Sequence, residues 1–201
     1  NTYWTGQPAG QALNFAFPLL LIIYLLNLVL EPSQSQMVLL TGLFFASGYF
    51  AYIFFSFASP ENYKSNVLGG LFYMLNIAII GEWYVPNPWF FLAYIGLPLT
   101  AIGCYFITKC YWRGILWLIF GYLFITSCFV NTPLVLIIIL SNILVIFYFG
   151  IVKNLNFNKQ LFLVFSVVTI FVLTNLWWLS LLLDFRQEGE QLYLLKQNVS
   201  H

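Results

Sequence analysis

The sequence predicts an all-α fold, a polytopic bundle of about seven transmembrane helices with the N-terminus inside and the C-terminus outside. Of the 201 residues, 62% are hydrophobic and only 6% are charged, whereas an average soluble domain carries about 25% charged residues. The apolar residues also gather in long runs. A helix needs about 20 such residues to cross ~30 Å of hydrocarbon. We therefore expect an integral membrane protein.

Turn signals and charges divide the apolar runs into seven expected spans. Charge and proline end the first two spans, at Glu31-Pro32 and Pro60-Glu61. Single charged residues end the fourth, sixth and seventh, because a charge inside the bilayer is costly. In chain order, the spans are Gln11–Leu30, Met37–Phe57, Val67–Val85, Trp89–Thr108, Gly114–Val130, Leu134–Val152 and Leu161–Leu183.

Two longer apolar stretches must each be split into two spans. Val67–Thr108 would measure roughly 60 Å as one helix, about twice the membrane thickness. Pro86-Asn87-Pro88 lies within it, and prolines remove backbone donors and disfavour helix in the residue before them. Asn131-Thr132-Pro133 is the one turn signal within Gly114–Val152. Both turns are expected at the membrane surface, because unpaired backbone groups in lipid cost several kcal/mol.

The distribution of charge predicts the orientation. With seven spans, the N-terminus and the second, fourth and sixth loops share one side. That side carries the cations Lys64, Lys109, Arg113, Lys153 and Lys159. The opposite side carries only two cations, Arg186 and Lys196, beside most of the acids. Because cations mark the cytoplasmic side of a membrane protein, we expect the N-terminus inside.

We expect residues 1–201 to form a single integral membrane domain with a short polar tail over residues 185–201. The segment Asn1–Gly10 has no basic region, so no signal peptide is expected before the first span. The three cysteines form no CxxC pair, and those within apolar runs are interpreted as small hydrophobic residues.

Close packing and hydrogen bonds are expected to hold the helices together, because hydrocarbon gives helices no reason to associate. Gly42 with Ala46, and Gly96 with Thr100, are pairs of small residues four apart that would let helices approach. Asparagines within the spans should bond between helices, each contributing about 0.6 kcal/mol. They are Asn14, Asn27, Asn76, Asn142 and Asn175.

Several kinds of chemistry have no residues to support them. The one histidine, His201, is the last residue, so histidine-dependent catalysis and haem ligation within the chain are excluded. No acidic pair and no metal-ligand set is present, and we assign no catalytic residue and no metal site. The net charge of +1 gives no basic surface for nucleic acid. No residue pattern indicates a particular cofactor.

One cluster on the expected outer side suggests substrate binding. Glu82 is a carboxylate at the edge of the hydrocarbon, and a partly desolvated carboxylate could bind a proton, a cation or an amine. Aromatic faces would assist through cation–π attraction. The expected substrate-binding residues are Asn76, Glu82, Trp83, Tyr84, Asn175, Trp177 and Trp178. The simpler interpretation is a solvated Glu82 beside an interfacial belt of tryptophans.

Lys109 and Arg113 flank the fourth loop, where anionic lipid headgroups would suit them. The simpler alternative is that they only anchor the chain on the cytoplasmic side.

Three functions are compatible with these observations. The first is a carrier or channel for a small molecule or ion, in which case replacing Glu82 by Gln should change uptake or its pH dependence. The second is a non-catalytic subunit of a larger membrane complex, with other membrane subunits as partners. The third, an intramembrane enzyme on lipid or isoprenoid substrates, has the least support, because no paired acids or metal motif is present. Membrane lipid is an expected partner of all three.

Overall fold

All regular structure in the described part of the chain, residues 17–75, 88–125 and 132–176 of this computed structural model, is helical. The all-α prediction is thereby confirmed, and each of the seven expected spans overlaps one helix. The helix that follows α8 is called the final helix. The seven are α2 (Phe17–Asn27), α3 (Pro32–Ala58), α4 (Tyr63–Met74), α6 (Pro88–Ile107), α7 (Tyr111–Ile125), α8 (Thr132–Val152) and the final helix, Phe157–Leu176.

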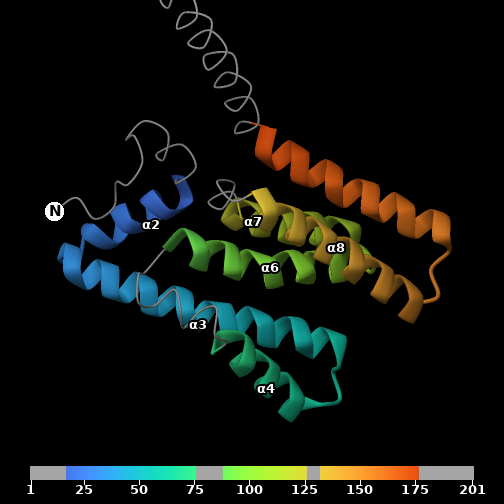
Figure 1. Cartoon of the computed structure of the whole chain (residues 1–201), viewed down its shortest axis with the longest axis horizontal. Coiled ribbons are helices and arrows are strands. Elements are labelled where there is room, and N and C mark those ends of the chain that lie inside the picture. Colours follow the sequence, from blue (N-terminus) through green and yellow to red (C-terminus); the bar gives the residue numbers. More distant parts are fainter. Residues whose placement is uncertain (1–16, 76–87, 126–131, 177–201) are drawn as a thin grey trace, which may run out of the picture.

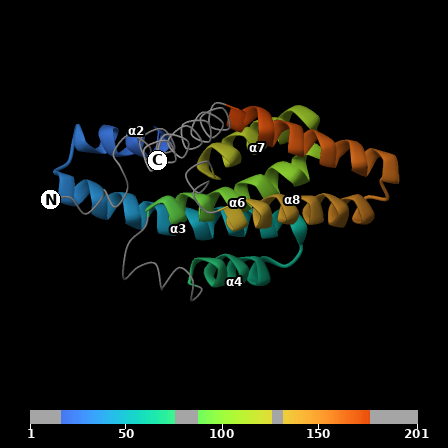
Figure 2. The same ribbon diagram turned by 45° about the horizontal axis from the view of Figure 1, so that its top comes forward.

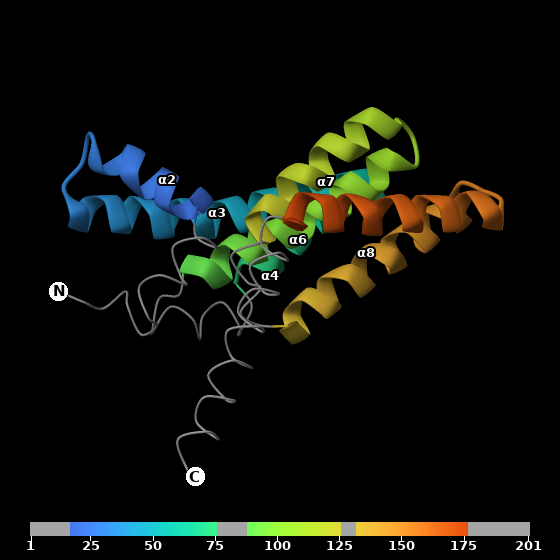
Figure 3. The same cartoon turned by 90° about the horizontal axis from the view of Figure 1, so that it is seen from above.

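Successive helices alternate in direction (Figure 1). α3, α6 and α8 run one way along the long axis, and α4, α7 and the final helix run back. The connections 59–62, 108–110 and 153–156 therefore lie at one end of the bundle, which we call the lysine end because it carries Lys109 and Lys153. Figure 2 shows α4 at the edge of the bundle, beyond α3. Figure 3 shows α8 and the final helix meeting at the lysine end and diverging from it.

Two helices in the described residues, Pro32–Ala58 and Phe157–Leu176, are long and apolar enough to cross a membrane. Three more apolar stretches of helix, 10–17 residues each, are shorter than a span: Phe91–Ile107, Tyr111–Ile125 and Leu136–Val152. Length and composition thus support a membrane location, and the seven-span topology stays a prediction.

α3 starts earlier than the sequence predicted, at Pro32 instead of Met37. The Glu31 side chain accepts from the third backbone N–H of the helix, and the Gln34 side chain accepts from the Glu31 N–H at 3.4 Å. This reciprocal arrangement is a capping box, and Pro32 takes the first helical position, where its missing N–H costs nothing. The charge and proline that were interpreted as an end of the first span thus also begin α3.

α6 is the central helix of the described structure. It contacts α2, α3, α7 and α8, and none of its residues 91–107 is exposed. One apolar cluster joins α6 to α2 and α3, around Leu43, Phe91 and Leu99. A second cluster joins α6 to α7, α8 and the final helix, around Leu118 and Ile146. Burying apolar side chains between helices on both sides fixes the position of α6 in the bundle.

Glycines bring α6 and α7 into close contact. A Cβ on Gly114 would lie 2.4 Å from the Ile107 backbone nitrogen, and one on Gly121 would lie 2.9 Å from the Thr100 nitrogen. A Cβ on Gly96 would meet Ile125 at 2.4 Å. The expected role of Gly96 and Thr100 in helix packing is therefore confirmed.

The corresponding prediction for Gly42 is wrong in the described structure. A Cβ on Gly42 would meet nothing within 4 Å, and the residue is exposed. Spacing of small residues alone does not show which face of a helix meets a neighbour. Ala46, its predicted companion, packs at the side of the apolar cluster between α3 and α6.

Candidate functional site

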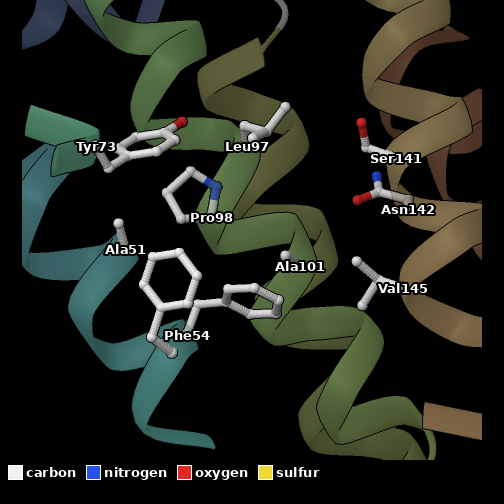
Figure 4. Close-up of a pocket in the computed structure, with 10 residues that line it drawn as sticks. Ala51, Phe54, Tyr73, Leu97, Pro98, Ala101, Ser141, Asn142 and Val145 are labelled. Carbon is white, nitrogen blue, oxygen red and sulfur yellow. The ribbon is translucent and has the colours of Figure 1, made fainter. Parts of the chain in front are cut away.

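A cavity of about 150 Å³ lies between α3, α4, α6 and α8. Figure 4 shows its walls: Ala51 and Phe54 come from α3, Tyr73 from α4, and α6 and α8 supply the remaining sides. Most of the lining is apolar, and the polar side chains at the wall are Tyr73, Ser141 and Asn142. The described residues that line it are Ala51, Phe54, Phe55, Tyr73, Leu97, Pro98, Ala101, Ser141, Asn142 and Val145.

Pro98 shapes one wall of this cavity. It lies within α6, where it has no N–H to give to the carbonyl of Tyr94 one turn earlier. The Tyr73 hydroxyl supplies that missing bond, donating to the Tyr94 carbonyl at 2.7 Å. In return, the Tyr94 hydroxyl donates to the Tyr73 carbonyl at 3.0 Å, and the two rings stack with centroids 4.1 Å apart. The carbonyl left free by the proline thus takes part in the hydrogen bonds that connect α4 to α6 beside the cavity.

Two polar side chains of α8 lie at the opposite wall. Asn142 is buried, and its side-chain amide donates to the Tyr122 hydroxyl on α7 at 3.1 Å. The prediction that Asn142 bonds between helices is therefore confirmed. Ser141 donates to the Ile137 carbonyl of its own helix at 2.7 Å, and its oxygen retains acceptor capacity. Both side chains thus donate to groups of the protein, and the surface that faces the cavity is almost entirely apolar.

The remaining asparagines behave differently. Asn175 is fully buried, but its side-chain amide donates to the Phe171 carbonyl of its own helix at 2.6 Å. Its Oδ1 has no partner among the described residues, and it is not part of the cavity wall. Asn27 is exposed at the end of α2, and among the described residues its side chain forms no bond to another helix of the kind we expected. Asn14 lies outside the described residues.

The other expected substrate-binding residues cannot be placed relative to this cavity. Asn76, Glu82, Trp83, Tyr84, Trp177 and Trp178 lie outside the described residues. Their gathering at one site therefore remains a prediction.

An aromatic layer separates the cavity from the lysine end. We define it as Phe54, Phe57, Tyr105 and Phe149. Phe54 lines the cavity and meets Phe149 edge-on, with ring centroids 6.5 Å apart. Phe149 in turn meets Tyr105 at 4.9 Å, and Phe57 stacks on Tyr105 at 5.1 Å. Tyr105 and Phe149 follow the cavity-lining Ala101 and Val145 by four residues, one helical turn.

Two lysines lie over this layer. The Nζ atoms of Lys109 and Lys153 are each 4.6 Å from the centre of the Tyr105 ring. Lys109 also donates to the Tyr105 hydroxyl, and Lys153 donates to Thr108 Oγ1. Burial and the neighbouring Lys109 lower the pKa of Lys153 to about 8. Desolvation and a nearby like charge both disfavour the protonated amine.

Local structure explains how the two lysines meet. α8 ends at Val152, and Asn154 follows with a positive φ of 52°, a conformation that asparagine tolerates well. The Leu155 N–H then bonds to the Gly150 carbonyl at 2.8 Å, which closes the turn. Lys153 is thereby held at the end of α8 and points back over Tyr105.

Lys109 was expected to act with Arg113 in binding lipid headgroups. Arg113 is exposed in the first turn of α7, and the cation that joins Lys109 over Tyr105 is Lys153. The sequence placed Lys153 on the same side as Lys109 but gave no sign that the two side chains meet. The sequence feature that could have indicated this meeting is the presence of aromatic residues near cations at the ends of three spans.

The chain has no recognised relative in three comparisons: no family model, no curated protein and no solved structure matches it.

Proposed function

We propose that this chain is a multi-pass membrane protein that carries a small, uncharged molecule through its helix bundle. The membrane placement is supported by the outer surface of the described helices. Large apolar side chains on several helices, such as Phe72, Leu116, Leu144 and Ile151, are more than half exposed, and so much exposed apolar surface is unusual for a protein in water. The cation-rich lysine end would face the cytoplasm.

The cavity is the observation that carries the transport proposal. The surface that faces it is almost entirely apolar, because the hydroxyls of Tyr73 and Ser141 and the side-chain amide of Asn142 already donate to other groups of the protein. None of the described residues that line it is charged, which favours an uncharged solute over an ion. Its volume is about 150 Å³, below the ~300 Å³ at which sites for drug-sized ligands begin. The expected substrate is therefore a molecule of few heavy atoms.

The aromatic layer would act as the barrier on the cytoplasmic side. Its rings pack against one another on the side of the cavity toward the lysine end, and rings could swing aside without breaking a helix. A carrier needs such a barrier, because a continuously open path would leak. Glu82 and its aromatic neighbours remain candidates for the opposite entrance.

Solute permeation into liposomes tests this proposal with a matched pair of variants. Val145 lines the cavity, whereas its neighbour Leu144 is 60% exposed on the outside of α8. Val145→Phe fills the cavity and should slow osmotic swelling in glycerol or urea at least tenfold, while Leu144→Phe should leave it unchanged. Thermal unfolding in detergent checks that both variants fold.

Ala101→Leu fills the same cavity from α6 and replaces Val145→Phe if that variant does not fold. Equal swelling rates in protein-containing and protein-free liposomes, across a series of small uncharged solutes, would contradict the carrier proposal.

A second candidate function, a non-catalytic subunit of a membrane complex, is favoured by the exposed face of α3. Gly42 leaves a gap there, with Val38, Phe45 and Tyr49 exposed around it. A small residue among large ones is a common contact point for another transmembrane helix. Mild-detergent purification distinguishes the two functions, since a stable, monodisperse monomer without co-purifying chains would argue against the subunit.

A further inference from the structure

The lysine end holds two cationic side chains over one aromatic ring. Lys109 and Lys153 come from different connections, yet both Nζ atoms lie 4.6 Å from the Tyr105 ring centre. Within the described residues, neither lysine forms an ion pair with a carboxylate. The charge of Lys109 acts unfavourably on that of Lys153, because like charges repel each other. An arrangement of this kind becomes favourable when an anion binds between them.

The surroundings hold the two amines in place. Tyr105 stacks on Phe57 with an interplanar angle of 9° and meets Phe149 edge-on. The lysines therefore lie against a set of packed rings. Lys153 Nζ also lies 5.6 Å from the Phe149 ring centre. Each ammonium uses one donor on a hydroxyl, of Tyr105 or Thr108, and an ammonium has three donors. Donors on both amines therefore remain for a ligand.

We propose that Lys109 and Lys153 form a binding site for a phosphate group. Phosphate offers three or more acceptor oxygens and up to two negative charges, which match two ammonium groups better than a carboxylate does. Lys109 is exposed and Lys153 is half-buried, so a ligand can reach the pair from outside the bundle. Burial, and secondly the charge of Lys109, lower the pKa of Lys153, so the two amines do act on each other.

The phosphate can belong to a lipid headgroup or to a molecule in solution, since both present the same oxygens. Basic pockets between helices on the cytoplasmic side are known to take anionic headgroups. The site does not depend on the carrier proposal, because the aromatic layer separates it from the cavity. Loss of phosphate binding and loss of solute permeation are therefore separate results.

Binding to the purified full chain tests the site in two arms. In the first, thermal unfolding in detergent is followed with added inorganic phosphate. In the second, the chain is placed in nanodiscs of phosphatidylcholine alone or with phosphatidic acid, and bound phosphatidic acid is counted by native mass spectrometry after mild extraction. Phosphate binding in the first arm assigns a soluble ligand, and retention of phosphatidic acid only assigns a headgroup. Binding in neither arm would overturn the proposal.

Charge-removing variants show whether these two lysines make the site. Lys109→Gln and Lys153→Gln should each weaken binding at least tenfold in the arm that is positive. Lys159→Gln is the matched control, since Lys159 is an exposed cation at the same end, and it should change the affinity less than twofold. Equal losses in all three variants would indicate general attraction to positive charge, and the proposal would be wrong.

A measurement on the unsubstituted chain guards against variants that fail to fold. Reductive methylation with ¹³C labels lysine amines, and their NMR shifts report each pKa. The pKa of Lys153, about 8 without ligand, should rise when the ligand from the positive arm is added, because a bound anion stabilises the charged amine. An unchanged titration of the lowest-pKa lysine at saturating ligand would also overturn the proposal.

Discussion

A proline inside α6 determines the hydrogen bonding of two tyrosines. Pro98 removes the helical partner of the Tyr94 carbonyl, and Tyr73 donates to that carbonyl at 2.7 Å from another helix. A buried carbonyl without a partner costs about 1–3 kcal/mol. The proline is thus tolerated because a second helix supplies the missing donor, which explains how α6 continues without a break.

We expect Tyr73→Phe to lower the free energy of unfolding by about 1–3 kcal/mol, because it leaves the Tyr94 carbonyl without its donor. In a Pro98→Ala background the helix supplies its own N–H, so the same substitution should cost no more than about half as much. Chemical unfolding of the two single variants and the double variant in detergent measures this coupling. Additive losses would show that Tyr73 acts independently of Pro98.

The hydrogen-bond partners of individual asparagines could be predicted only in part. Asn142 bonds to Tyr122 between helices, as expected, but Asn175 bonds to its own helix and Asn27 is exposed. A residue type shows that a side chain needs a partner. Which partner it finds depends on the rotation of the helix and on what the neighbouring helix presents. Neither quantity is visible in one sequence.

The two-lysine site could not be recognised either, because one sequence does not show how the helices are arranged. Lys109 and Lys153 are separated by two whole helices in the sequence, and each looked like an ordinary cation at the end of a span. Their meeting over Tyr105 follows from the turn at Asn154 and from the packing of α8 on α6. Contacts between side chains of different helices require the three-dimensional arrangement.

Between elements, the closest contact is the pair α6 and α7. Gly96 and Gly103 on α6 face α7, and Gly114 and Gly121 on α7 face α6. In each helix the two glycines are seven residues apart, two helical turns, so they lie on one face. This spacing lets the two backbones approach along their length, which favours van der Waals packing.

Adding one methyl group to this contact should destabilise the protein. A Cβ at Gly114 would lie 2.4 Å from the Ile107 nitrogen, and overpacking of this kind costs about 1–3 kcal/mol. Gly42→Ala is the control, since nothing lies within 4 Å of that position and alanine favours helix over glycine. Thermal unfolding should show a lower midpoint for Gly114→Ala and an unchanged or higher one for Gly42→Ala. Equal midpoints would mean that α6 and α7 are not packed this closely.

The predicted spans located the helices well but placed several of their starts too late. α4 begins at Tyr63 instead of Val67, because Asn62 caps it by accepting from the Ser65 N–H at 3.3 Å. The search for spans counted apolar residues, whereas a helix begins where its first N–H groups find acceptors. Polar residues at helix starts are therefore lost when only hydropathy is considered.

For the whole molecule, alternation of the helices agrees with the charge pattern. The second, fourth and sixth loops of the prediction correspond to the connections that lie together at the lysine end (Figure 1). The division of Val67–Thr108 and of Gly114–Val152 into two helices each was necessary for this agreement. Hydropathy and turn residues were sufficient for the order of the helices, because length and backbone satisfaction in lipid leave few alternatives.

Cysteine labelling tests the orientation with a residue already present. Cys110 is exposed in the connection between α6 and α7, at the lysine end, whereas Cys104 is buried. If the lysine end faces the cytoplasm, Cys110 is reachable only from inside the cell. In a Cys128→Ser background, a membrane-impermeant maleimide should then leave Cys110 unlabelled in intact cells and label it in inside-out vesicles.

Two variants complete the labelling experiment. Cys110→Ser should abolish the reaction in vesicles. Ser33→Cys, at the exposed start of α3 near the opposite end, should react in intact cells. Labelling of Cys110 from outside would reverse the proposed topology.

Enclosure of the central helix determines how lipid can influence this protein. Within the described structure, α6 has no exposed side chain between residues 91 and 107, so it has little contact with the surroundings of the bundle. A change in bilayer thickness or in detergent acts first on the outer helices, and it reaches the cavity only through their tilt. α6 would then serve as the fixed axis against which such movements occur.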